Sequence, residues 1–264
     1  MNKKGICFKM KRTLCAFLTI FMTMSLVSAN VFASGVDYDT ILTAHGVPQD
    51  VISQMTEHQK QDICENISTD AEFAGHETKQ LSFADEDGDD SGISPAYVEL
   101  PERNMDLSVT GFKESNGTYS IYVHFYWYPL VRVANDSLAC SMYPGWEVYP
   151  GNQKLRVWSN DDNDNHLESF DIAPINPSYS GYDFKIPSNK GKTLGFYEGT
   201  AYFYVQKKES SATPRIAVQY AHDDTSACNL SFGVNIGIGS ISVTGASDNL
   251  QVRGEIFDLP SSFN

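Results

Sequence analysis

Short stretches that alternate apolar and polar side chains run through the chain from residue 105 onward. The clearest is Tyr119–Tyr128, where one alternate set is apolar and consists of Ile121, Val123, Phe125 and Trp127. Successive side chains of a β-strand point to opposite faces, so a period of two predicts a strand with this set facing a core. Such a chain must pack its sheets face to face or close a sheet on itself.

Turn signals separate these stretches. Asn116–Gly117 precedes the strand above, and both residues of that dipeptide tolerate the positive φ of a tight hairpin. No helical period interrupts the series, which predicts an antiparallel β-sandwich over residues 105–264, with a closed barrel as the alternative. The further predicted strands are 154–158, 167–172, 182–186, 199–207, 215–222, 229–236, 240–244 and 250–257.

Two segments of different composition precede the sandwich. Residues 34–67 carry apolar residues at helical spacing, with Gly46 as a helix end and Thr56 as an N-cap, and they predict a short helical segment. Residues 68–104 contain the run Asp-Glu-Asp-Gly-Asp-Asp-Ser-Gly at 85–92. This run is nearly free of apolar side chains and cannot repay its ordering entropy, so it predicts an acidic flexible linker.

The N-terminus has the order of residues that is typical of an export signal. Basic residues precede an apolar stretch at 14–27, and Val31 and Ala33 satisfy the small-residue rule of a cleavage site. The apolar stretch is shorter than the roughly 20 residues of a spanning helix, so residues 1–33 are interpreted as a cleaved signal peptide rather than a membrane anchor. We therefore expect a secreted, extracellular protein. The basic residues are Lys3, Lys4, Lys9, Lys11 and Arg12.

The remaining charge is strongly acidic. The whole chain has a formal net charge of -14 at pH 7, and the charged residues of the predicted leader are all basic, so the processed chain is more acidic still. Repulsion between like charges argues against nucleic acid and anionic lipid headgroups as partners. We expect no transmembrane segment after removal of the leader, because no second apolar stretch is long enough.

Three cysteines lie beyond the leader. An exported protein is exposed to oxidising conditions, and Cys140 and Cys228 both lie in the predicted sandwich, which makes a bridge between them the natural pairing. Cys64 lies in the helical segment and is left over. The alternative is that all three serve as small apolar residues.

An acidic turn between two predicted strands is a candidate metal site. Hard cations such as calcium prefer several oxygen ligands from one flexible loop. Side-chain oxygens recur at Asn160, Asp162, Asp164, Glu168 and Asp171, a spacing that resembles a calcium loop. The alternative is a solvated hairpin loop rich in turn-forming residues. We expect no other cofactor.

The second alternate set of the strand at 119–128 is polar and aromatic. Tyr122, Tyr126 and Tyr128 belong to it and would face outward, where aromatic rings can stack on a sugar or contact a protein. The alternative is that these tyrosines cover a half-buried sheet.

No catalytic motif is present in the sequence. It lacks the His-Glu-x-x-His metal helix and the Gly-x-Ser-x-Gly elbow, and its six histidines are scattered. We therefore expect a secreted non-enzymatic protein that binds a glycan or a protein. Two alternatives stay open. One is an extracellular glycosidase-like hydrolase with two facing carboxylates. The other is a membrane-active toxin or bacteriocin-like factor with aromatic strands at a lipid interface.

Two stretches carry a resemblance to a known group. The first is the apolar helix-turn-helix pattern from Ile41 to Met55, and the second contains Phe125-Tyr126-Trp127, Ser137-Leu138-Ala139, Trp146 and residues 199–207. With these stretches the chain resembles the small exported β-sandwich proteins of Gram-positive bacteria. No activity is assigned to that group, so the resemblance implies location and fold only.

Overall fold

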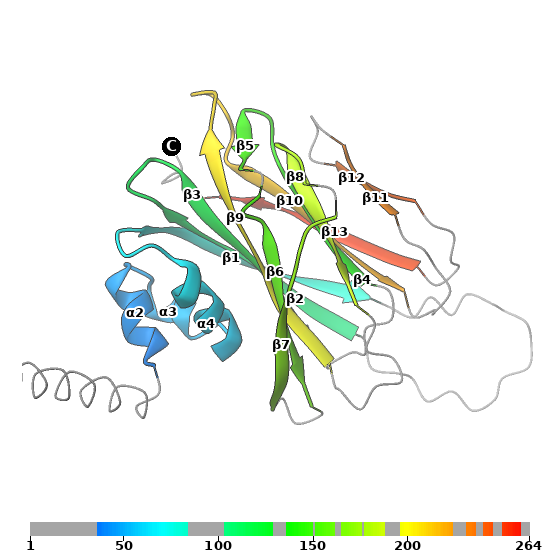
Figure 1. The fold of residues 1–264 in the computed structure, drawn as a ribbon, viewed down its shortest axis with the longest axis horizontal. Coiled ribbons are helices and arrows are strands. Elements are labelled where there is room, and N and C mark those ends of the chain that lie inside the picture. Colours follow the sequence, from blue (N-terminus) through cyan, green and yellow to red (C-terminus); the bar gives the residue numbers. More distant parts are fainter. Residues whose placement is uncertain are drawn as a thin grey trace, which may run out of the picture. The chain divides into compact units, whose positions relative to one another are not determined.

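The computed structural model describes residues 36–83, 103–128, 136–149, 151–161, 165–175, 177–187, 196–223, 231–235, 240–244 and 250–259. The chain separates into residues 1–40 and residues 41–264, and the second unit holds the sheets. Two antiparallel sheets of seven and four strands pack as a sandwich and are preceded by short helices (Figure 1), which confirms the predicted fold class. The predicted leader, residues 1–33, lies outside the described residues.

Three short helices form where helical spacing was found. They are α2 (Tyr38–Ala44), α3 (Gln49–Ile52) and α4 (Glu57–Asn66). Gly46 follows α2 with φ 85°, a conformation that side chains with a Cβ rarely adopt. The Thr56 hydroxyl accepts a hydrogen bond from the Gln59 amide at 3.0 Å, which confirms the predicted cap of α4.

The larger sheet is antiparallel at every described pairing. Its hydrogen-bonded order is β1-β2-β3-β9-β6-β7, and β5 also pairs with β9. The bounds are β1 (Glu72–Phe83), β2 (Arg103–Lys113), β3 (Tyr119–Tyr128), β5 (Trp146–Val148), β6 (Lys154–Asn160), β7 (His166–Ile172) and β9 (Phe196–Lys207).

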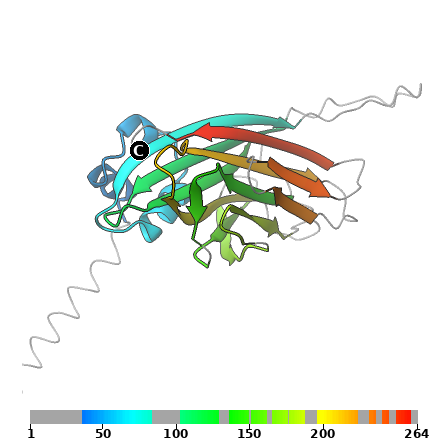
Figure 2. The same cartoon turned by 90° about the horizontal axis from the view of Figure 1, so that it is seen from above.

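The smaller sheet has the order β13-β10-β4-β8, and β11 and β12 form a separate antiparallel pair. The bounds are β4 (Asp136–Met142), β8 (Gly181–Ile186), β10 (Arg215–Asp223), β11 (Ser231–Asn235), β12 (Ser240–Thr244) and β13 (Leu250–Asp258). Figure 2 shows β13 running beside β1, so the two sheets meet along these edge strands. There the Asp258 amide donates to a Glu77 carboxylate oxygen at 3.1 Å.

The prediction of a linker over residues 68–104 is wrong for the segment that forms β1. This strand pairs along β2 from Glu72 opposite Lys113 to Phe83 opposite Arg103. Its inward residues Leu81 and Phe83 are buried, and the polar residues Gln80 and Ser82 alternate with them at exposed positions. The average composition of residues 68–104 does not reveal this strand. The acidic run at 85–92 lies outside the described residues.

Two clusters of buried side chains hold the second unit together. The main core lies between the sheets and contains Trp127, Phe125 and Tyr220 among its largest members. A second cluster lies on the opposite face of the larger sheet, where Ile52 and Ile63 of the helices pack with Phe112, Tyr122 and their neighbours. The helices therefore cover one outer face of the sandwich. Within the described ranges, no helix has the length and apolarity needed to cross a membrane.

Candidate functional site

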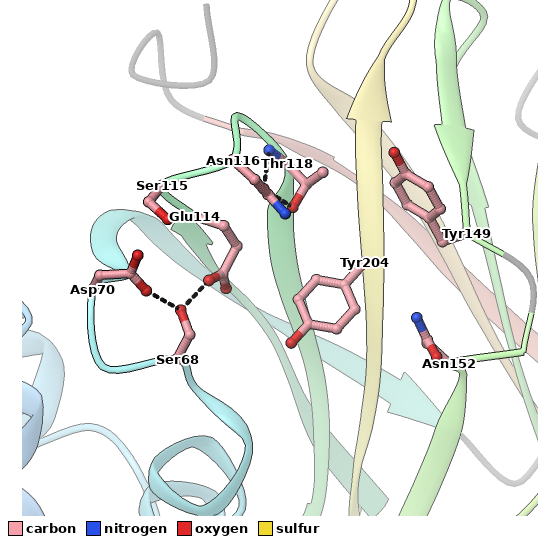
Figure 3. Close-up of a pocket in the computed structure, with 9 residues that line it drawn as sticks. All are labelled: Ser68, Asp70, Glu114, Ser115, Asn116, Thr118, Tyr149, Asn152 and Tyr204. Carbon is pink, nitrogen blue, oxygen red and sulfur yellow. Dashed lines mark hydrogen bonds between the residues drawn. The ribbon is translucent and has the colours of Figure 1, made fainter.

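A pocket of about 420 Å³ opens at one end of the larger sheet (Figure 3). The connection between α4 and β1, the turn between β2 and β3, and the connection between β5 and β6 meet β9 there. The lining residues are Ser68, Asp70, Glu114, Ser115, Asn116, Thr118, Tyr149, Asn152 and Tyr204.

The predicted hairpin at Asn116–Gly117 is confirmed and forms one wall of the pocket. Gly117 has φ 79°, and the Glu114 amide donates to the Thr118 carbonyl at 2.9 Å. The Asn116 side-chain oxygen accepts from the amide and the hydroxyl of Thr118 at 2.9 and 2.7 Å. Because that oxygen is engaged by the turn itself, the amide nitrogen of Asn116 is left as a donor on the pocket wall.

Two carboxylates of the pocket share one hydroxyl group. The Ser68 Oγ lies 2.9 Å from Asp70 Oδ1 and also makes a short hydrogen bond with Glu114 Oε2 (Figure 3). Hydrogen bonds from Ser115 and Ser68 lower the pKa of Asp70 below its ordinary value. Glu114 is 7% exposed, and its Oε1 has no hydrogen-bond partner among the described residues. A buried carboxylate oxygen without a donor is costly unless something else supplies one.

Tyrosine rings line the pocket on the side away from these carboxylates (Figure 3). The Tyr204 ring packs edge-on against Tyr202 at 5.3 Å between centroids, and the Tyr149 amide donates to the Tyr204 carbonyl at 3.0 Å. The Tyr149 hydroxyl donates to Gln206 at 2.7 Å. These contacts fix both tyrosines on β9 and the strand end beside it.

The tyrosines predicted to form a contact face have different environments. Tyr122 is on the face that was expected, away from the main core, but it is 0% exposed. Its ring packs against Phe112 and Tyr202 beneath the helices, and burial raises its pKa well above the ordinary value. Tyr122 is therefore not available at the surface. Tyr126 is half-buried, the side chain of Tyr128 lies outside the described part of the chain, and their predicted contacts stay predictions.

The residues of the predicted calcium loop that can be placed do not converge. Asn160 is 0% exposed and its amide nitrogen donates to Glu198 at 3.1 Å, away from any loop ligand set. Asp171 lies opposite Arg156, which donates to it at 2.9 Å. Asn160 lies four positions from Arg156 along β6, about 13 Å at the usual rise of a strand.

The other members of that loop leave the calcium prediction open. Glu168 is exposed on β7, and Asp162 and Asp164 lie outside the described residues. Within the described ranges, no three histidine, cysteine or acidic side chains form a group that could hold a metal ion.

Cys140 carries a free thiol in this structure and is 1% exposed in the main core. Burial raises the pKa of this thiol to about 12. Its predicted partner Cys228 lies outside the described residues, and the part of the chain that is described contains no disulfide. The Cys140–Cys228 bridge stays a prediction.

Sequence reasoning missed a buried group of histidines and a carboxylate under α4. The Glu198 side chain on β9 is 2% exposed and contacts His58 of α4, which stacks on Trp158 at 4.2 Å. Asn160 donates to Glu198 Oε1, and His124 Nε2 lies 3.5 Å from Glu198 Oε2. No spacing in the sequence signals this group, because its members meet only when β9 lies between β3 and β6.

A second buried acid in the same region fastens α4 to the sheet. Asp62 accepts a hydrogen bond from the Trp158 indole nitrogen at 3.0 Å, and Arg156 lies 3.4 Å away. Burial raises the pKa of Asp62 to about 7, against the hydrogen bonds that it accepts. Glu198 and Asp62 are almost closed to solvent and connect α4 to the sheet, so the pocket is the more accessible of the two sites.

No protein-family profile and no curated protein matches the sequence. Among solved structures, the collagen-binding domain of a Staphylococcus aureus adhesin is 8% identical, with a TM-score of 0.30 over 48% of this chain and 86% of that chain. The collagen-binding domain of the Erysipelothrix rhusiopathiae surface protein RspB is 10% identical, with a TM-score of 0.34 over 69% and 59%. The Clostridium perfringens delta-toxin is 5% identical, with a TM-score of 0.32 over 73% and 94%. TM-scores this low carry no argument about function.

Proposed function

We propose that the chain is an exported, non-enzymatic binding protein and that the pocket beside Glu114 is its ligand site. The observation that carries the proposal is the buried Oε1 of Glu114, which lacks a hydrogen-bond partner among the described residues and belongs to a residue of the pocket wall. A concave site with a few converging polar groups is the usual form of a ligand site. The basic and apolar leader pattern supports export.

The lining supports a ligand that donates hydrogen bonds. Hydroxyl, amide and carboxylate groups on one wall face two tyrosine rings, a combination suited to a glycan or to side chains of a protein. Asp70 and Glu114 repel an anionic ligand. These two carboxylates share Ser68 on a single wall, whereas the carboxylates of a glycosidase face each other across the bond that they cleave.

Arrays of glycans and of extracellular matrix proteins test the proposal. The full chain is expressed with its leader, recovered from the culture medium, labelled and applied to both arrays. We expect binding to at least one array component, lost in Tyr204→Ala because one aromatic wall of the pocket is removed. Tyr179→Ala is the matched control, since Tyr179 is 62% exposed and does not line the pocket. Absence of binding, or equal binding by both variants, overturns the proposal.

A further inference from the structure

We infer that the pocket receives the cationic tip of a lysine or arginine side chain from a protein partner. The inference rests on the proposed function and assigns a ligand class to the same site. It follows from the protons available to the carboxylates, from the charge of the lining, and from the placement of the tyrosines.

One hydroxyl proton serves two carboxylates at Ser68. A serine hydroxyl has one proton, yet Asp70 Oδ1 and Glu114 Oε2 both lie within hydrogen-bond distance of Ser68 Oγ. At any moment only one of the two carboxylates receives that proton. The other Glu114 oxygen, Oε1, has no donor among the described residues although the side chain is 7% exposed. The carboxylate oxygens on this wall therefore accept fewer hydrogen bonds from the wall's own donors than they can accept.

The pocket lining is acidic. The described lining contains the carboxylates of Asp70 and Glu114 and no lysine, arginine or histidine. In the described part of the chain, the pKa of Asp70 is lowered by hydrogen bonds to hydroxyl and backbone groups, with no cation among the causes. A neutral polyol would supply hydrogen bonds but leave this negative charge uncompensated. An ammonium or guanidinium group supplies both, and a charge-assisted hydrogen bond is about twice as strong as a neutral one.

The placement of the two carboxylates and the two tyrosines suits a cation on a long side chain. Glu114 is buried and Asp70 is exposed, so a cation on a long, thin stem can pass the outer carboxylate and reach the inner one. Lysine and arginine have such stems, which pack along apolar surface while the charge extends beyond them. The rings of Tyr149 and Tyr204 lie across the pocket from the carboxylates (Figure 3), and aromatic rings attract a cation. The broad terminal torsion of a glutamate lets its carboxylate turn either oxygen to the ligand.

A metal ion fits the wall less well than an organic cation. Calcium takes six to eight oxygen ligands at roughly 2.3–2.6 Å, and most calcium sites contain several carboxylates. The pocket offers two, and the described ranges contain no group of three metal-binding side chains.

Titration calorimetry with small probes tests the inference on the full chain recovered from the medium. The probe is Nα-acetyl-lysine methylamide, and its neutral match is Nα-acetyl-norleucine methylamide, which keeps the stem and lacks the ammonium group. We expect the lysine probe to bind at least about tenfold more tightly than the neutral probe. Added salt should weaken the lysine probe selectively, because salt screens charge attraction.

Two variants test whether the carboxylates of the pocket bind the lysine probe. Glu114→Gln keeps the shape of the side chain, removes the charge, and should weaken the lysine probe by about tenfold. Asp70→Asn, at the exposed edge, should weaken it less and serves as the second variant if Glu114→Gln does not fold. Glu147→Gln is the control, because Glu147 pairs with Lys208 and does not line the pocket.

The outcomes separate the inference from the proposed function. The inference is overturned if the norleucine probe, or N-acetylglucosamine titrated in the same way, binds as tightly as the lysine probe. It is also overturned if Glu114→Gln and Asp70→Asn leave the affinity for the lysine probe unchanged. Array binding that depends on Tyr204 would then still support the proposed function. Failure of every probe together with failure on the arrays overturns both.

Discussion

The carboxylate of Glu198 on β9 contacts the imidazole of His58 on α4, although 140 positions separate the two residues in the sequence. Glu198 is also held by Asn160 of β6 and lies near His124 of β3. One buried charge therefore joins the helical segment to three neighbouring strands of the larger sheet. This contact explains why the helices pack on the sandwich and do not form a separate N-terminal segment.

Removal of the Glu198 carboxylate should destabilise the fold strongly. Glu198→Ala leaves the Asn160 amide and His58 without their acceptor, and each buried polar group left unsatisfied costs about 1–3 kcal/mol. Urea unfolding of wild type and variant measures the loss. Glu147→Ala, at a half-exposed position, is the control and should change stability by no more than about 0.5 kcal/mol. Equal effects of the two substitutions would contradict the structural role of Glu198.

Glu198 also predicts a loss of stability in acid. Burial raises the pKa of Glu198, but the hydrogen bond from His58 and the charges of His124 and His58 outweigh it and hold the pKa below its ordinary value. A depressed pKa contributes stability above the unfolded-state value and loses it as pH falls through the folded-state value. Unfolding measured below pH 5 should therefore show less difference between wild type and Glu198→Ala than at pH 6.

Asp62 predicts the opposite dependence on pH. Burial raises its pKa to about 7, so the folded chain binds a proton that the unfolded chain releases above about pH 4. Its contribution to stability is full at low pH and is lost as pH rises from about 4 to 7, at up to about 1.4 kcal/mol per pH unit. Asp62→Asn removes this titration. The free energy of unfolding of the variant should therefore rise relative to that of wild type between pH 5 and pH 8. If the unfolding free energies of wild type and Asp62→Asn change equally between the two pH values, the raised pKa of Asp62 is refuted.

The Cys140 thiol should resist alkylation in the folded chain. It is 1% exposed, and burial raises its pKa to about 12, so the reactive thiolate is scarce at pH 8. Iodoacetamide followed by peptide mass spectrometry should modify Cys140 only after denaturant is added. Cys140→Ala confirms the assignment of the peptide. If modification of the unfolded chain requires reductant, Cys140 is bridged, as its pairing with Cys228 would require.

Much of the sandwich could be predicted because its information is local. The alternation in β3 and the Asn116–Gly117 turn each depend on neighbouring residues, and both are found as expected. The edge strand β1 was missed because charged and polar residues outnumber apolar ones between Glu72 and Gln80, which resembles a linker when composition is averaged. Its only distinctive signal was the inward spacing of Leu81 and Phe83.

The pocket could not be predicted for a different reason. Its carboxylate wall forms because β1 runs antiparallel to β2, which places the start of β1 beside the end of β2. Ser68 and Asp70 thereby reach Glu114, 46 positions from Ser68, and no local pattern records that approach. The prediction that Tyr122 is exposed failed in the same way, because the cover of that face comes from helices distant in sequence.

The most direct test of the pocket as a cation-binding site is a map of backbone amide chemical shifts in the ¹⁵N-labelled chain during titration with Nα-acetyl-lysine methylamide. The largest shifts should fall on residues 114–118 and on Tyr149 and Tyr204, and in Glu114→Gln they should require about tenfold more probe. Shifts concentrated on α4 and β7, or shifts that persist unchanged in Glu114→Gln, would contradict the assignment of the ligand site to this pocket.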